Sequence, residues 1–297
     1  MNIILAIFML YRKPIYFSLG ILLTFGLIFF GVTSNAQNQK LQVVFLDVGQ
    51  GDAILISHGE KQILIDGGPS GQKLMEKIGA YVPFWDRKID VVIATHPDAD
   101  HISGLVDVLK NYSVDQIIES GAKSESQVFG ALEKSIEEKK IEKQLARRGM
   151  KIKLSDEAEL EVFSPTDAVM DSLKDDTNSA SIVAKLTYGE NSFLFTGDLP
   201  LELESQLINA ELPLNSDVLK VSHHGSKSAT SEHFLELVSP EGAVISVGKS
   251  NRYNHPTAEV LERLKNDNVK ILRTDVSGDV AYDCLNTKNK CESSVTK

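Results

Sequence analysis

The stretch Ala94-Thr-His-Pro-Asp-Ala-Asp-His-Ile-Ser-Gly-Leu105 carries four side chains that can bind a metal within six residues: His96, Asp98, Asp100 and His101. The segment before it, residues 89–94, is short, apolar and rich in β-branched residues, which predicts a buried strand. From Leu105 onward the pattern predicts a helix. The four side chains are therefore expected on a tight turn at the carboxyl end of a strand, where α/β proteins place their chemistry. Imidazole and carboxylate together suit zinc, manganese or iron.

Further side chains of the same types recur later in the chain, each beside a predicted strand or helix. Asp66 lies in L-I-D-G-G and Asp198 in F-T-G-D. His223 and His224 lie in V-S-H-H-G-S, and His255 in N-H-P. An acidic turn that held two histidines by chance would not require these partners, so the sequence indicates a metal centre.

These segments resemble the metallo-β-lactamase superfamily, whose usual signature is His-x-His-x-Asp-His. Asp98 stands where the second histidine of that signature normally lies. This departure, together with the motifs above and D-V-G-Q-G-D-A at Asp47–Ala53, resembles the extracellular hydrolase domain of ComEC-type competence DNA-uptake proteins. The resemblance covers roughly residues 41 to 283. It implies an α/β fold, a four-layer αββα sandwich with two metals at one edge, and the alternation of strand-rich blocks with helices agrees.

The resemblance also implies which residues bind each metal. Asp198 would bridge the two ions. His96 and Asp98 would complete the first site, and the second site would add Asp100, His101 and His224. His224 is favoured over His223 as a ligand, with His223 facing a phosphate or transferring a proton, but the two remain alternatives.

A second departure concerns the histidine that the superfamily usually places before the bridging aspartate. No histidine occurs between His101 and His223. The polar candidates in that interval are Asp176, Asn178 and Ser179, and water is the alternative. The first site would then be rich in oxygen ligands, so manganese is expected as an alternative to zinc.

Two other positions have implied roles in the site. Asp66 stands at the family position of a buried carboxylate that orients the metal loop, although an ordinary Asp-Gly turn would also explain it. His255 could act as a general acid or as a ligand, or it could be a surface residue beside a helix.

Paired metal ions share a hydroxide and neutralise charge on the attacked centre, which suits a phosphodiester. His223 or His255 could protonate the leaving group. The sequence therefore predicts a metal-dependent phosphodiesterase or nuclease acting on DNA. Alternatives are hydrolysis of another ester (a phosphorylcholine ester, a lactone or a β-lactam) and a catalytically degenerate extracellular binding module. The retained ligand set argues against the binding module.

The composition of the chain limits the classes of protein to which it could belong. A chain of 297 residues with 24% charged residues can bury a sizeable core and is typical of a globular protein. The net charge of −10 counts mildly against nonspecific nucleic-acid binding, which depends on Lys and Arg contacts to phosphate.

The amino-terminal segment differs from the rest of the chain. Residues 15–32 form one uncharged apolar run, preceded by Arg12 and Lys13 and followed by the small residues Ser34-Asn35-Ala36. This pattern predicts a cleaved signal peptide or an uncleaved membrane anchor over residues 1–36, with the hydrolase domain at 37–297. Either alternative places the domain outside the cytoplasm, secreted or membrane-anchored.

The sequence also predicts three local features of the chain. Residues 125–148 read as one amphipathic surface helix ended by Gly149. His58 is expected in an exposed turn. An extracellular location makes a disulfide between Cys284 and Cys291 plausible.

Overall fold

The computed structural model describes residues 21–24, 40–173 and 176–297. Two compact units are distinguished, Met1–Lys40 and Leu41–Lys297. In the first unit only residues 21–24, which are helical, and Lys40 are described, so most of the predicted apolar segment and its boundary at residue 36 lie outside the described residues. None of the helices in the described ranges combines the length and apolar character needed to cross a membrane.

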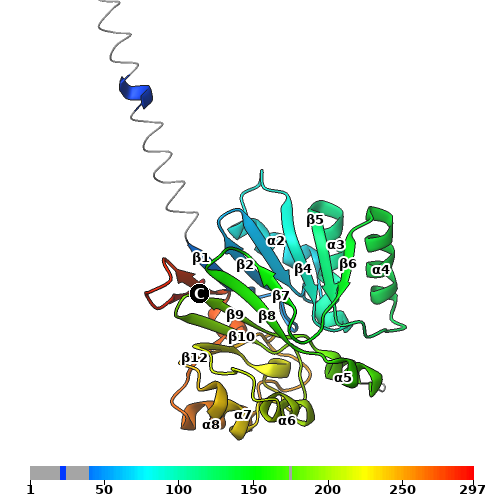
Figure 1. Ribbon diagram of the computed structural model, residues 1–297, viewed down its shortest axis with the longest axis vertical. Coiled ribbons are helices and arrows are strands. Elements are labelled where there is room, and N and C mark those ends of the chain that lie inside the picture. The colour runs from blue at the N-terminus through cyan, green and yellow to red at the C-terminus, as the bar shows by residue number, and fades with distance from the viewer. Residues whose placement is uncertain (1–20, 25–39, 174–175) are drawn as a thin grey trace, which may run out of the picture. The chain divides into compact units, whose positions relative to one another are not determined.

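The second unit contains two mixed β-sheets (Figure 1). The first sheet has the order β15-β14-β1-β2-β3-β4-β5-β6, and the second has the order β13-β12-β11-β10-β9-β8-β7. The strands of the first sheet are β1 (Leu41–Phe45), β2 (Ile54–His58), β3 (Lys61–Ile65), β4 (Lys88–Ala94), β5 (Ser113–Glu119), β6 (Glu142–Leu145), β14 (Val280–Cys284) and β15 (Glu292–Val295). Those of the second are β7 (Lys151–Lys153), β8 (Ala158–Ser164), β9 (Val183–Tyr188), β10 (Asn191–Phe195), β11 (Val218–Lys220), β12 (Gly242–Ile245) and β13 (Lys270–Arg273).

Helices cover the outer face of each sheet. Those beside the first sheet are α2 (Gly71–Tyr81), α3 (Ala99–Asn111) and α4 (Gln127–Lys139). Those beside the second are α6 (Leu201–Asn209), α7 (Glu232–Val238) and α8 (Ala258–Asn266). Short helical segments elsewhere are α5 (Asp167–Asp171), α9 (Thr274–Ser277) and the 3₁₀ turns η1 (Thr177–Ala180) and η2 (Ser222–Gly225). The predicted four-layer αββα sandwich is therefore confirmed.

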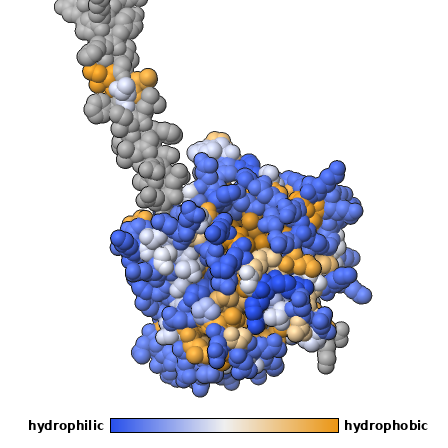
Figure 2. Space-filling view, in the orientation of Figure 1, coloured by the Kyte–Doolittle hydropathy of each residue, from blue (hydrophilic) through white to orange (hydrophobic). Residues whose placement is uncertain are grey.

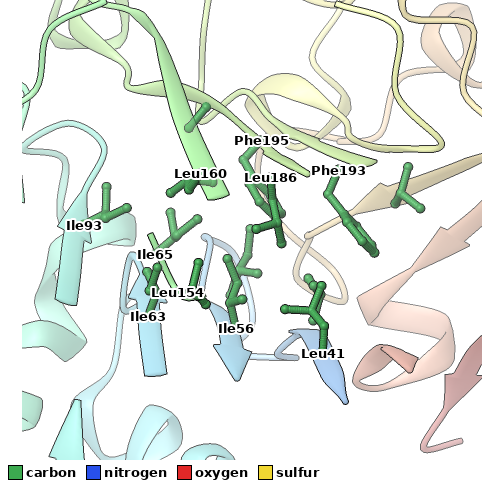
Figure 3. Packing of buried hydrophobic residues seen from close by; sticks show 14 of the residues in the cluster. Leu41, Ile56, Ile63, Ile65, Ile93, Leu154, Leu160, Leu186, Phe193 and Phe195 are labelled. Carbon is green, nitrogen blue, oxygen red and sulfur yellow. The ribbon is translucent and has the colours of Figure 1, made fainter. Parts of the chain in front are cut away.

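The core between the sheets is built from branched aliphatic and aromatic side chains. Ile56, Ile63 and Ile65 project from the first sheet toward Leu186 and Phe195 of the second (Figure 3). β1 and β4 are buried on both faces. This explains why their sequences are nearly continuous apolar runs rather than alternating patterns. The sandwich therefore stacks the two sheets through a single apolar layer.

The parallel strands of both sheets place their carboxyl ends at one edge. β3, β4 and β5 are parallel neighbours in the first sheet, and β10, β11 and β12 are parallel neighbours in the second. Loops that leave these ends carry the residues singled out in the sequence. This edge is where the fold can assemble a site from segments far apart in the chain.

Two of the predicted element boundaries were wrong. α3 begins at Ala99, so Asp98 is its N-cap position and His101 lies in the first helical turn. α4 ends at Lys139, and Lys140 adopts a left-handed conformation (φ 54°) before β6, which pairs in parallel with β5. Pairing with β5 overrides the helical propensity of residues 142–145, because that segment completes the edge of the sheet.

Two other local expectations have definite outcomes. His58 is buried at the end of β2, where its ring packs edge-on against Tyr188 with centroids 5.3 Å apart, so the prediction of an exposed turn residue was wrong. The disulfide between Cys284 and Cys291 is confirmed.

Candidate metal centre

The signature stretch leaves the end of β4 and enters α3 in a single turn. His96 lies two residues beyond β4, and Asp100 and His101 occupy the first turn of α3. A helix amino terminus favours nearby negative charge, which suits Asp100. The rings of His96 and His101 lie close together, with centroids 4.1 Å apart. The local turn thus directs both imidazoles into the sheet edge, where they are fully buried.

Residues from the second sheet meet this turn. Asp198 follows β10, and His224 lies in η2, directly after β11. The His101 Nε2 atom lies 3.4 Å from Asp198 Oδ1, and the His224 Nε2 atom lies 3.5 Å from Asp198 Oδ2 and 3.5 Å from Asp100 Oδ2. The two sheets therefore contribute to one constellation.

The inward-facing atoms of this constellation lack partners. Among the described residues, no hydrogen bond satisfies His96 Nε2, His101 Nε2, His224 Nε2 or Asp198 Oδ1, although all four are buried. Buried polar atoms in proteins are nearly always satisfied, so a convergent set of exceptions requires an explanation. Ligand atoms within 4.8 Å of one another form four overlapping groups among the described residues, two of which contain Asp52. The other two are His96, His101 and Asp198, and Asp100, His101 and His224. The donor set fits divalent cations.

The outward-facing ring nitrogens, by contrast, are engaged by the protein. Asp66, directly after β3, accepts hydrogen bonds from Thr95 N at 2.8 Å and from Thr95 Oγ1 at 2.7 Å, and its Oδ2 lies 2.8 Å from His101 Nδ1. His224 Nδ1 lies 2.8 Å from the carbonyl oxygen of Ser246. Such contacts fix which ring nitrogen faces inward, which is the usual arrangement around ligand histidines.

The electrostatic field of the site is set by its buried carboxylates. Burial and the neighbouring His101 lower the pKa of His96 to about 4, so its imidazole is neutral near pH 7. Burial alone would lower the pKa of His224, but Asp198, Asp100 and Asp52 outweigh it and raise that pKa to about 9. The carboxylates thus favour positive charge at this point, whether a proton or a metal cation supplies it.

Sequence reasoning assigned no role to two buried residues of the site. Asp52, in the loop before β2, contacts the Lys220 ammonium group, and both side chains are buried. Lys220 Nζ also donates to the carbonyl oxygen of Gly197 at 2.9 Å and lies 3.8 Å from Asp198 Oδ1. The signals were present, since Asp52 belongs to D-V-G-Q-G-D-A and Lys220 ends an apolar strand just before V-S-H-H-G-S. Their pairing becomes visible only in the folded structure, where the loop before β2 lies close to β11.

Other predicted residues lie at the rim rather than among the convergent atoms. Asp98 has a side chain 39% exposed, and one of its oxygens accepts a hydrogen bond from Thr177. Asp98 Oδ2 lies 3.9 Å from His96 Nε2, and Asp98 is absent from the convergent groups found among the described residues. Of the three polar candidates near η1, Asn178 lines the pocket, and its buried Oδ1 has no hydrogen-bond partner among the residues that the structure describes. Asp176 and Ser179 are hydrogen-bonded to each other.

A pocket of about 210 Å³ opens above the constellation. His223 and His255 form part of its wall with their ring centroids 5.7 Å apart, and the Tyr253 ring stacks on His255 at 5.7 Å. His223 Nε2 lies 3.7 Å from Asp198 Oδ2, and the His223 side chain is partly exposed. The pocket is lined by Gln50, Asp98, Asp100, Asn178, Asp198, His223, His224, Tyr253 and His255.

The sequence profile of the Metallo-beta-lactamase superfamily matches residues 46–249 of this chain. The chain belongs to the metallo-β-lactamase superfamily. The matched region includes the whole convergent set described above, and this superfamily is generally hydrolytic and metal-dependent. The metallo-β-lactamase fold typically binds two divalent metals.

Within the metallo-β-lactamase superfamily, the chain is similar to several competence proteins. It is 34% identical over 259 residues to ComE operon protein 3 of Bacillus subtilis, covering 81% of this chain and 33% of that protein. It is 28% identical to Competence protein ComA of Neisseria gonorrhoeae, covering 89% of this chain and 35% of that protein. The chain spans about a third of the length of these curated relatives.

A solved structure of similar fold is the metallo-beta-lactamase fold protein YhfI from Bacillus subtilis. The TM-score is 0.54 at 12% identity, covering 82% of this chain and 100% of that chain. At this identity the likeness concerns the fold alone.

Proposed function

We propose that this chain is a metal-dependent phosphodiesterase that cleaves nucleic acid outside the cytoplasm. The observation that carries the proposal is the convergence, beneath an open polar pocket, of ligand atoms from His96, His101, His224 and Asp198 that have no hydrogen-bond partner in the described part of the chain. The similarity to competence proteins supports nucleic acid as the substrate class.

The residues fit two neighbouring cations. His96 and Asp198 would bind the first, with Asp98 approaching from the rim. Asp100, His101 and His224 would bind the second, and Asp198 lies beside both groups. Divalent cations held by these ligands would act as Lewis acids toward a phosphodiester and would make water a stronger nucleophile.

The remaining residues of the site position ligands and move protons. Asp66 holds His101 so that Nε2 faces the centre. His223 and His255 stand at the pocket wall, where either imidazole could protonate the oxygen that leaves the phosphorus. His255 Nδ1 is buried and has no hydrogen-bond partner among the described residues, which leaves it available to a substrate.

The rim of the pocket offers groups that suit a nucleotide. The Tyr253 ring is 48% exposed, and the Arg252 guanidinium lies 4.9 Å from the centroid of that ring. An exposed aromatic ring provides a stacking platform for a base, and a guanidinium can pair with a phosphate. Two exposed lysines lie near pocket residues in the sequence: Lys227 is three residues after His224, and Lys249 is four residues before Tyr253.

The test is hydrolysis by the purified chain, after metal removal and reconstitution with zinc or manganese in separate samples. The substrates are single-stranded DNA, double-stranded DNA, bis-p-nitrophenyl phosphate and nitrocefin. We expect metal-dependent cleavage of the phosphodiesters and no cleavage of nitrocefin. Asp198→Ala should lose both bound metal and activity while the circular dichroism spectrum is unchanged.

A matched variant addresses the substrate class. Tyr253→Ala should weaken the apparent affinity for DNA, because base stacking is lost, and should leave the turnover of methyl p-nitrophenyl phosphate nearly unchanged. Cleavage of a lactone, a phosphorylcholine ester or nitrocefin in the absence of any phosphodiester cleavage would contradict the proposal. So would full activity of Asp198→Ala at matched metal content.

A further inference from the structure

The loop between α2 and β4 (residues 82–87, the α2–β4 loop) exposes two adjacent aromatic side chains. Phe84 is 78% exposed and Trp85 is 74% exposed, the highest values among the large hydrophobic residues described in the second unit. Their rings pack edge-to-face with centroids 4.9 Å apart. Adjacent exposed aromatic rings are unfavourable in water and commonly mark a contact surface.

This loop lies at the edge of the sandwich opposite the metal centre. Trp85 precedes the amino end of β4, whereas His96 follows its carboxyl end, and a strand of this length separates them by about 23 Å. β1 begins at this same edge, because Leu41 pairs with His58 at the turn between β2 and β3. A surface pocket lined by Glu60, Lys61 and Trp85, among others, joins that turn to the α2–β4 loop.

The figures show the same arrangement. The cyan α2–β4 loop projects beyond the strands at the end where β1 begins (Figure 1). In Figure 2 the projecting tip is pale to orange against mostly blue surroundings. Leu285, 60% exposed, adds a third apolar side chain at this edge, because the preceding Cys284 pairs with Leu41.

Charged groups around the loop are engaged within the protein. Lys61 and Lys88 both pair with Asp90, and Asp86 accepts a hydrogen bond from Gln62. The Arg87 guanidinium lies 5.5 Å from the centroid of the Tyr112 ring. The surface therefore presents aromatic rings without an excess of free cations, which is the character of the aromatic belts found at lipid–water boundaries rather than of a polybasic patch.

The chain that precedes this edge indicates what covers it. The apolar run ends at residue 32, and β1 begins at Leu41. The nine Cα–Cα steps from residue 32 to Leu41 can span at most about 32 Å. If the run lies in a bilayer, the edge of the domain where β1 begins (the entry edge) is therefore held close to the lipid surface.

We propose that Phe84 and Trp85 insert into the headgroup region of a lipid bilayer, so that the entry edge faces the membrane and the metal centre faces away from it. This proposal rests on the extracytoplasmic location given under the proposed function and on the membrane-anchor alternative for residues 1–36, and not on the hydrolytic chemistry. Trp and Phe are suited to this region because the rings are apolar and the indole N–H can still reach water.

The chain contains a single tryptophan, so its intrinsic fluorescence reports on Trp85 alone. The full chain would be mixed with phosphatidylcholine vesicles, with and without bromine atoms on the acyl chains. We expect the emission of Trp85 to shift to the blue on vesicle binding and to be quenched by the brominated lipid. Raising the salt concentration should change neither effect, because aromatic insertion does not depend on charge.

A matched control moves the reporter to the opposite edge. Trp85→Phe combined with Tyr253→Trp places the only tryptophan beside the metal centre, where brominated lipid should not quench it. In a separate variant, Phe84→Ser should reduce the quenching of Trp85 without unfolding the chain, because Phe84 is exposed.

Three results would overturn the proposal: an unquenched Trp85 in vesicle-bound protein, failure of the full chain to bind vesicles, and a blue shift without lipid that grows with protein concentration. The last result would assign the surface to a second copy of the chain. Phosphodiester hydrolysis measured in the same samples separates the two proposals. Quenching without hydrolysis would contradict only the proposed function, and hydrolysis without quenching would contradict only the membrane contact.

Discussion

Lys220 is the residue whose importance emerges only from the structure. Its ammonium group is fully buried between Asp52 and Asp198, and it donates to the carbonyl oxygen of Gly197. A buried lysine is tolerated only when it is paired and hydrogen-bonded, so the cation holds the carboxylates of the site together.

We expect Lys220→Met to lower the free energy of unfolding by about 3–5 kcal/mol, because it leaves buried carboxylates without their cation. Lys185→Met provides a control: Lys185 is partly exposed and donates to the carbonyl oxygens of Pro213 and Asn215 away from the metal centre, so its loss should cost about 1 kcal/mol. Urea denaturation of the metal-free proteins measures both. Equal losses for the two variants would show that Lys220 has no special role.

Asp98 carries a second prediction at the residue scale. A carboxylate supplies negative charge and oxygen where an imidazole would supply a neutral nitrogen, and manganese gains more from this than zinc. We expect manganese to support phosphodiester hydrolysis at least as well as zinc in the wild type, and Asp98→His to move the preference toward zinc. The measurement compares rates on one phosphodiester after reconstitution with each metal. An unchanged ratio would mean that Asp98, which lies at the rim, does not set the preference.

At the scale of elements, the sequence predicted most of the sandwich but not every boundary. The predicted strand before His96 is present because its apolar β-branched residues suit a strand buried on both faces. The helix predicted over residues 125–148 is present at Gln127–Lys139, but its extension to residue 148 was wrong. The charged residues favour a helix locally, whereas residues 142–145 gain hydrogen bonds from β5. That pairing joins Gln116 to Glu142 and leaves no local signal in the sequence.

The candidate site was likewise predicted from the sequence only in part. Every proposed ligand came from a short motif that could be recognised by its residue types. The pairing of Asp52 with Lys220 depends on a loop of the first sheet meeting a strand of the second, and the rim position of Asp98 depends on where α3 begins. Neither property is encoded in the spacing of nearby residues.

The start of β3 is tied to β4 by Asp90, and this contact gives a prediction that depends on pH. Burial opposes ionisation of Asp90, but hydrogen bonds from Lys88, Gln62 N and Lys61 outweigh it and lower its pKa below the ordinary value of 3.8. A carboxyl whose pKa is lowered by folding stabilises the folded state above its unfolded pKa. That stabilisation is lost as pH falls through the folded pKa.

We therefore expect Asp90→Asn to reduce the free energy of unfolding by about 1 kcal/mol near pH 7. The difference from wild type should shrink below pH 3.8 and vanish once Asp90 is protonated. Denaturation of both proteins across this range tests the prediction. A difference that stays constant with pH would show that the ionised carboxylate is not what stabilises the contact.

At the scale of the whole molecule, the location of the domain is a prediction from the sequence. Arg12 and Lys13 ahead of the apolar run favour a cytoplasmic amino terminus, and a disulfide forms in oxidising compartments. We expect alkaline phosphatase fused after residue 40 to be active in cells, because that enzyme needs an oxidising environment. A fusion lacking residues 1–36 is the control and should be inactive. Equal activity of the two fusions would contradict the predicted location.

The pairing of β1 with β14 has a consequence for the order in which the protein can be completed. Leu41, near the start of the domain, pairs with Cys284, near the end of the sequence. A chain delivered amino end first must therefore hold one side of β1 open, with unpaired backbone groups, until nearly all of the domain has emerged. During that interval β1 is an edge that other chains could join. A protein built in this way depends on prompt and uninterrupted delivery, and a pause late in synthesis would be more harmful to it than a pause early on.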